Sequence, residues 1–253
     1  MDLLLKKEEI CNEEKSVIAA AVLSATIFLS ACTSAENEQT PPKLPGVPWG
    51  STTDQALESL GTDREKLGEN LTVYEEGAGA ATAILENQEV FGQTSEGLIL
   101  YFSATKDGKG ALTRAEVYYP DHADMEKVGQ EMEKAFGQPA EAMTIYGMDG
   151  KANTNSTGEK SRYWQGQLLQ EVLDENQKID LRQYVAHQGP NIREKIDDNQ
   201  WEAYLKNPMA TASWHTEYQN PQTEQLQENP GLKEYKNVVI LDGSQQVQVD
   251  ELS

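Results

Sequence analysis

Leu98–Ala104 reads "LILYFSA", and together with the turn that follows it decides the fold class. Its apolar side chains alternate between two faces, with Leu98, Leu100 and Phe102 on one of them. This period-2 alternation is typical of a β-strand that buries one face. The Asp-Gly pair inside Lys106–Gly110, "KDGKG", predicts a hairpin turn directly after the strand.

The segment after the turn, Leu112–Tyr119 ("LTRAEVYY"), alternates in the same way. It places Val117 on one face of the strand and Tyr118, with charged residues beside it, on the other face. Such alternation indicates an antiparallel meander with one buried and one wet face. Short apolar runs predict further strands before and after this hairpin: Leu71–Glu75, Ala81–Glu86, Ala142–Tyr146, Arg162–Gln165, Lys178–Ala186 ("KIDLRQYVA"), Ala210–Tyr218 and a candidate last strand at Tyr235–Asp242.

Helical patterns flank the predicted meander. Thr52 and Gln55 form a capping-box pattern at the start of a short helix, and "TDREKLG" predicts a second helical turn. Residues 121–139 predict a longer helix, capped by Asp121 or Asp124 and ended by Gly137. Another short helix is predicted at Asp197–Pro208, and Met148–Lys160 is expected to be a polar loop. We therefore expect an α+β fold in which short N-terminal helices and one longer helix pack on an antiparallel meander sheet.

The N-terminal part of the chain predicts where the protein is located in the cell. Val17–Ser30 is uncharged but shorter than the roughly 20 residues of a membrane-spanning helix, and it fits the apolar core of a secretory signal. It ends in Leu29–Cys32, "LSAC", which resembles the bacterial lipobox. The resemblance implies cleavage before Cys32 and attachment of a lipid to its sulfur. The expected organisation is a signal peptide (1–31), a lipidated cysteine and flexible tether (32–48), a globular body (49–218) and a polar tail with the candidate last strand (219–253), of which Gly243–Ser253 is expected to fray.

Composition excludes some classes of function. The net charge of −21 repels phosphate backbones, so we expect no nucleic-acid partner. The two cysteines are Cys11 and Cys32, of which the first leaves with the signal and the second carries lipid. No disulfide or thiolate metal site is therefore expected.

Motifs for catalysis are missing from the sequence. There is no His-Glu-x-x-His pair, no Gly-x-Ser-x-Gly elbow and no glycine-rich phosphate loop, and the three histidines are scattered. We therefore expect that the protein is not an enzyme and that it binds no metal and no cofactor. Aromatic side chains are the remaining candidates for binding: Tyr118 and Tyr184, placed beside charged residues on a wet face, and Trp164.

Two phrases carry a resemblance to a known group: Trp49–Gly61, "WGSTTDQALESLG", and Met125–Pro139, "MEKVGQEMEKAFGQP". They resemble bacterial lipoproteins and secreted proteins with the fold of the beta-lactamase inhibitory protein, a fold shared by the small outer-membrane lipoprotein of the barrel-assembly machinery. The resemblance implies helices packed on a curved antiparallel sheet, in one unit or two small ones, with a later tryptophan (Trp164) and an alternating strand ("KIDLRQY").

These observations favour a lipid-anchored protein on the extracytoplasmic face of a cell membrane or outer membrane, with a non-enzymatic binding role and an envelope protein as partner. Two alternatives stay open. One is a lipoprotein that binds a small solute or peptide. The other is an envelope hydrolase built on a pair of carboxylates, which the many acidic residues leave open but which no motif picks out.

Overall fold

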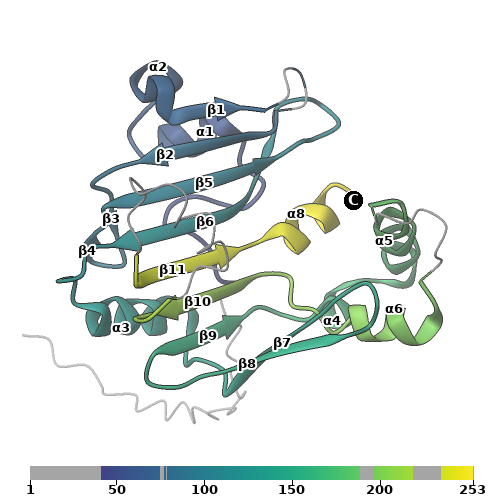
Figure 1. The fold of residues 1–253 in the computed structure, drawn as a ribbon. Helices are drawn as coiled ribbons and strands as arrows, with labels where there is room; N and C mark the ends of the chain where they lie inside the picture. Colours follow the sequence, from purple (N-terminus) through teal and green to yellow (C-terminus); the bar gives the residue numbers. More distant parts are fainter. Residues whose placement is uncertain (1–40, 75–76, 78, 189–195, 219–234, 253) are drawn as a thin grey trace, which may run out of the picture. The chain divides into compact units, whose positions relative to one another are not determined.

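A seven-stranded antiparallel sheet organises the structure (Figure 1). The computed structural model describes residues 41–74, 77, 79–188, 196–218 and 235–252. The strands of this sheet are β1 (Leu71–Val73), β2 (Ala81–Leu85), β5 (Gly97–Ser103), β6 (Ala111–Tyr119), β9 (Ser161–Gln165), β10 (Thr211–His215) and β11 (Asn237–Asp242). They lie in the order β1-β2-β5-β6-β11-β10-β9. Two small hairpins stand apart: β3 (Glu89–Val90) with β4 (Gln93–Thr94), and β7 (Ala142–Tyr146) with β8 (Ala152–Ser156).

The described helices precede, interrupt and follow these strands. They are α1 (Thr53–Ser59), α2 (Arg64–Leu67), the 3-10 turn η1 (Gly68–Asn70), α3 (Met125–Phe136), α4 (Leu169–Val172), α5 (Glu175–Gln188), α6 (Asp198–Tyr204) and α8 (Ser244–Asp250). The predicted α+β class is confirmed. The helices also begin at the caps that the sequence predicts. Thr52 and Gln55 form the capping box of α1, and Asp124 caps α3 by accepting a hydrogen bond from the Lys127 amide.

The main core lies between one face of the sheet and the helices α1 and α3. Alternate residues of β5 are buried, namely Leu98, Leu100 and Phe102, and Val117 of β6 is also fully inside. Helix α3 buries a stripe with the periodicity of a helix, and its residues join the same cluster as the sheet: Met125, Val128, Met132 and Phe136. In Figure 1, α1 lies behind the sheet, so the opposite face of β5 and β6 points toward the viewer.

Two tryptophans attach both ends of α3 to the sheet. The Trp214 indole on β10 donates to the carbonyl oxygen of Met125 at 2.8 Å, and the Trp164 indole on β9 donates to that of Gly137, also at 2.8 Å. Arg162 lies over the Trp214 ring, 4.7 Å from its centroid, and forms ion pairs with Glu126 and Glu133 of α3. The position of α3 is therefore set by directional bonds as well as by apolar contact.

The strand order is symmetric about the central pair, β6 and β11. Before the centre, α1 is followed by β2, β5 and β6; after it, α3 is followed by β9, β10 and β11. Each half thus supplies a helix and three antiparallel strands, of which the last lies in the middle of the sheet, and the first half adds β1 as a further strand at the edge. Both halves share one sheet, and the described residues belong to one compact unit.

A second apolar cluster is built by the helices between β9 and β10 and by α8. Leu169, Leu181, Trp201 and Val249 are among its buried members. The strand predicted at Lys178–Ala186 is wrong, because this segment belongs to α5.

The physical reason is that the segment carries two periods at once. Ile179, which fits only the alternating pattern, is 55% exposed, whereas Leu181 and Val185, four residues apart, are buried. Asp174 then favours the helix, since its carboxylate accepts hydrogen bonds from the amides of Asn176 and Gln177.

Three further expectations are corrected around the sheet. The polar segment Met148–Lys160 is not all loop, because Ala152–Ser156 pairs with β7 as β8, and Gly150 adopts the positive φ that the turn requires. Gly243–Ser253 does not fray at its start: Ser244–Asp250 is α8, and its Val247 and Val249 are buried. The last strand, β11, lies between β6 and β10, so the body does not end at residue 218.

The expected tether is also shorter than residues 32–48. Leu44 and Val47 are each 1% exposed and belong to the main core, and the Trp49 indole donates to the carbonyl oxygen of Pro42 at 2.7 Å. The prolines of this stretch favoured a linker, but the two apolar residues between them find space beside the sheet. The folded body therefore begins by Pro42.

This packing gives the first prediction. Replacing Leu44 with alanine is expected to lower the free energy of unfolding by about 2–4 kcal/mol, because a fully buried leucine is lost from a packed core. The neighbouring exposed Lys43, changed to alanine, is the control and is expected to stay within about 0.5 kcal/mol. Urea unfolding of the three proteins measures both values. Equal stability of all three would mean that residues 42–48 are a tether after all.

Candidate functional site

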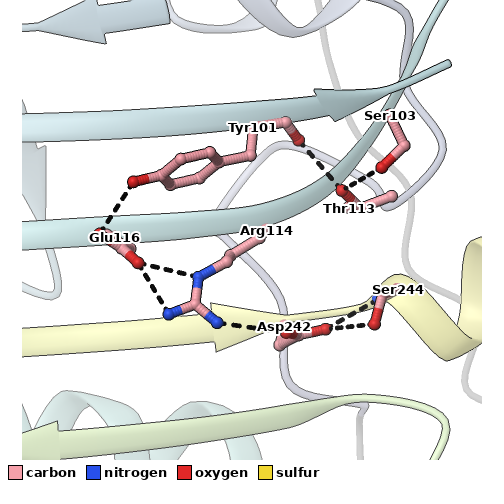
Figure 2. A network of polar contacts seen from close by, with 7 residues as sticks. All are labelled: Tyr101, Ser103, Thr113, Arg114, Glu116, Asp242 and Ser244. Atoms are coloured by element: carbon pink, nitrogen blue, oxygen red, sulfur yellow. Dashed lines mark hydrogen bonds and ion pairs between the residues drawn. The ribbon is translucent and has the colours of Figure 1, made fainter. Parts of the chain in front are cut away.

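The face of the sheet opposite the main core carries a polar network centred on Glu116 (Figure 2). Glu116 is 8% exposed, and both of its carboxylate oxygens accept hydrogen bonds. One oxygen accepts a hydrogen bond from the Nε of Arg114 at 2.8 Å and forms an ion pair with a terminal nitrogen of the same guanidinium at 2.7 Å. The other oxygen accepts from the hydroxyls of Tyr101, at 3.1 Å, and Tyr118. The three strand-borne partners leave this buried carboxylate with no unsatisfied oxygen.

The network crosses from β6 to the last strand. Arg114 also reaches Asp242 of β11 at 3.4 Å, and the other oxygen of Asp242 accepts from the amide and hydroxyl of Ser244 at the start of α8. Figure 2 shows this arginine between the two carboxylates. Burial, reinforced by the negative charge of Glu116, raises the pKa of both Tyr101 and Tyr118 above the usual value, so these hydroxyls stay protonated donors.

Four tyrosines surround this network and form what we name the outer tyrosine patch: Tyr101, Tyr118, Tyr218 and Tyr235. Each is partly exposed. The rings of Tyr118 and Tyr235 lie 5.0 Å apart, centroid to centroid, and burial together with the charge of Glu116 raises the pKa of Tyr218. The patch brings together residues from β5, from β6 and from both sides of residues 219–234. Partly exposed tyrosines are common in binding surfaces.

His215, on β10, extends the aromatic row beyond the patch. Its ring lies 5.2 Å from that of Tyr218 and 5.7 Å from that of Tyr163. Burial lowers the pKa of His215 to about 4, so the imidazole is neutral at neutral pH. Its two ring neighbours are aromatic, which is a packing environment.

Two cavities lie away from the outer tyrosine patch, and residues of the turn between β5 and β6 line part of each. One, of about 330 Å³, is lined by Thr105, Asp107 and residues of α8. The other, of about 460 Å³, is lined by the start of α1, by Arg64 and by glycines of two turns. Neither shares a lining residue with the outer tyrosine patch.

The candidate residues of the sequence are thus separated by the structure. Tyr118 lies on the face opposite the core, as predicted. Tyr184 does not join it, since it belongs to α5 and packs on the second apolar cluster. Trp164 is fully buried with its indole nitrogen bonded, so the proposed binding role for it is wrong and its role is to hold α3. Cys32 lies outside the described residues.

The sequence did not point to Asp242, Tyr218 or Tyr235 as parts of this site. Asp242 lies 128 positions from Arg114 in the chain, and only the pairing of β6 with β11 brings them together. Alternation placed Glu116 on the wet face, but nothing in the sequence showed that its carboxylate would be buried and saturated.

Within the described part of the chain, no group of three or more His, Cys, Asp or Glu residues could hold a metal ion. None of the helices described there has the length and apolar character to cross a membrane. Comparisons of the chain with protein-family models, with curated proteins and with solved structures found no match.

The environment of His215 predicts a pH dependence of stability. Its folded pKa, about 4, lies below the unfolded value near 6.5, so the stabilising effect of the neutral ring is complete above pH 6.5 and is lost as the pH falls toward 4. Between pH 7.5 and 5.5 this loss is expected to be about 1 kcal/mol. Urea unfolding should show that His215→Gln removes this part of the pH dependence, whereas His122→Gln, at an exposed position, retains it. Parallel profiles for the wild type and His215→Gln would contradict the assignment.

Proposed function

We propose that this protein is a lipid-anchored, extracytoplasmic binding protein of the bacterial cell envelope, and that it contacts an envelope protein through the outer tyrosine patch. The anchor is supported by Leu29–Cys32 at the end of the apolar run, and the kinship with proteins of the beta-lactamase inhibitory protein fold is part of the same proposal. The observation that carries the binding role is the group of partly exposed tyrosines, two of which, Tyr101 and Tyr118, donate hydrogen bonds to the buried carboxylate of Glu116.

A non-enzymatic role is supported by the same geometry. Glu116 is the buried carboxylate of the patch, and both of its oxygens are occupied by three hydrogen bonds and an ion pair within the network. Arg114 is engaged by two carboxylates, and the neutral His215 lies among aromatic rings. Side chains fixed in this way suit recognition, because little conformational entropy is lost when a partner binds.

The short link between anchor and body constrains the partner. If the lipid is on Cys32 and the body begins by Pro42, residues 33–41 are the only link, and at about 3.4 Å per residue they reach no further than about 30 Å. The body then stays close to the bilayer. The proposed partner is therefore a membrane-embedded or membrane-apposed envelope protein, in the inner, the outer or a single membrane.

A second candidate function, the binding of a small solute, is supported by the larger of the two cavities. The cavity of about 460 Å³ is within the size range of small-molecule sites, which favours the alternative of a small-solute lipoprotein. No feature of the described residues favours the envelope hydrolase.

The anchor can be tested at one atom. Replacing Cys32 with serine removes the sulfur that would carry the lipid, so we expect the variant to lose both radiolabelled palmitate and its partition into the membrane fraction. Cys11→Ser is the matched control, since the same change there leaves the lipobox intact. Membrane partition of Cys32→Ser equal to that of the wild type, with no label in either, would disprove the anchor.

The partner surface can be tested in intact cells. A photoreactive phenylalanine analogue at Tyr118 or Tyr218 should give a covalent adduct with one envelope protein, because both positions lie in the proposed interface. Ile179 of α5 is a stringent control: it is 55% exposed, more than the patch residues, and it lies outside the patch. Exposure alone would make Ile179 the most reactive of the three positions. Adducts at Ile179 and none at Tyr118 or Tyr218 would contradict the proposal.

A further inference from the structure

Exposed apolar side chains gather at the edge of the sheet that β1 forms. Strand β1 pairs only with β2 among the described strands, and its last residue, Val73, is 45% exposed. The next residue, Tyr74, is 68% exposed, and Ile84 of β2 is 39% exposed. Apolar side chains that are exposed together, and not singly, are a mark of interaction surfaces.

Strand pairing places two of these side chains on the same face as the outer tyrosine patch. The hydroxyl of Tyr74 donates to that of Thr82 at 3.0 Å, and Thr82 is the cross-strand partner of Tyr101. Ile84 is the partner of Ile99, which lies on the face of β5 opposite the main core. We name Tyr74, Ile84, Ile99 and Tyr101 the edge stripe. It meets the outer tyrosine patch at Tyr101, and no described helix lies in front of β2 and β5 (Figure 1).

The charge of this part of the chain has one sign. Between Lys66 and Lys106 the sequence has no lysine, arginine or histidine, and it has six glutamates. Two of them border the edge stripe, since Glu86 directly follows β2 and Glu96 directly precedes β5. Glu86 is exposed, and its carboxylate has no hydrogen bond or ion pair within the described part of the chain.

The cations that flank the edge stripe are already engaged by carboxylates. Helix α2 contacts β2, and its Arg64 and Lys66 each pair with an aspartate. On the other side Arg114, the cross-strand partner of Tyr101, lies between two carboxylates. The glutamates at this edge are therefore not neutralised by these cations, and a positively charged partner would be complementary to them.

We propose that the edge stripe binds a segment of the partner protein that carries both apolar and cationic side chains. The apolar side chains would lie on Ile84, Ile99 and Tyr101, and the cations would contact the carboxylate of Glu86 and the ring face of Tyr74. This inference rests on the proposed function and adds to it the chemistry of the partner. A second copy of this chain is disfavoured as the occupant, because it would bring the same sign of charge to the edge.

The first test uses the full chain purified in detergent and three labelled synthetic peptides. One peptide is built of valine and lysine, the second has glutamate in place of each lysine, and the third has serine in place of each valine. Fluorescence anisotropy should show saturable binding of the valine–lysine peptide and about tenfold weaker binding of the other two, because each lacks half of the recognition. No saturable binding of the valine–lysine peptide would overturn the inference. Equal binding of the serine–lysine peptide would reduce the attraction to charge and overturn it as well.

Matched substitutions separate the edge stripe from the rest of the acidic surface. Ile84→Thr keeps a β-branched side chain on the strand and should weaken binding of the valine–lysine peptide about fivefold, because apolar contact is lost. The control is Ile179→Thr, at a position 55% exposed on α5, which should leave binding unchanged. Equal effects of the two changes would overturn the site.

A second pair of variants examines the charge. Glu86→Gln should weaken binding of the same peptide about threefold and reduce its dependence on salt, because one exposed ion pair is lost. Glu202→Gln, which removes an exposed glutamate of α6, is the control and should change neither value. Equal effects at the two positions would indicate general attraction to an acidic protein and would overturn the role of Glu86.

A photoreactive phenylalanine analogue at Ile84 in intact cells distinguishes this inference from the proposed function. Its adduct should join the same envelope protein that is captured at Tyr118, at a segment in which mass spectrometry finds lysine or arginine beside apolar residues. An adduct at Tyr118 and none at Ile84, or an adduct at Ile84 to an acidic segment or to a second copy of this chain, would overturn this inference alone. The absence of adducts at both positions would contradict the proposed function as well.

Discussion

The structure depends on the antiparallel pairing of β6 with β11, two strands that lie in opposite halves of the chain. Register between Tyr119 and Asn237 at one end, and between Arg114 and Asp242 at the other, makes one sheet out of two helix-and-meander halves. The cross-strand ion pair of Arg114 and Asp242 lies on this seam and continues to the start of α8. Loop closure of such length is costly in entropy, so the apolar residues on the other face of both strands must supply most of the compensating free energy.

The same seam explains why the polar face is ordered. A glutamate placed at the centre of a sheet would be costly to bury alone, and here Arg114, Tyr101 and Tyr118 supply the donors that offset its desolvation. The consequence is that the hydroxyls of Tyr101 and Tyr118 are held in position by the carboxylate of Glu116. Side chains fixed in this way are what the proposed contact with a partner requires.

The features of the site and of the fold that could be predicted are those set by residues close together in the sequence. Alternation in Leu98–Ala104 assigned the correct faces, and Asp124 and Thr52 marked the starts of their helices, because capping and turn chemistry act within a few residues. The errors came where two local patterns competed or where burial was decided from a distance. Residues 178–186 fit both a strand and a helix by their local pattern, and the burial of Leu181 and Val185 in the second cluster is what selects the helix. Leu44 lies in a proline-rich stretch that predicts a linker, but it is buried in the main core.

The sequence by itself determined the α+β class, the central hairpin, the face on which Tyr118 lies and the strongly acidic charge, since each follows from side-chain periodicity or composition. The tertiary structure alone decided that Trp164 belongs to the core, that β11 lies in the middle of the sheet, and that turns about thirty residues apart meet glycine against glycine. The physical reason is range: periodicity and capping are encoded within one or two turns of chain, whereas strand pairing, saturation of a buried carboxylate and the walls of a cavity require residues that only the folded chain brings together.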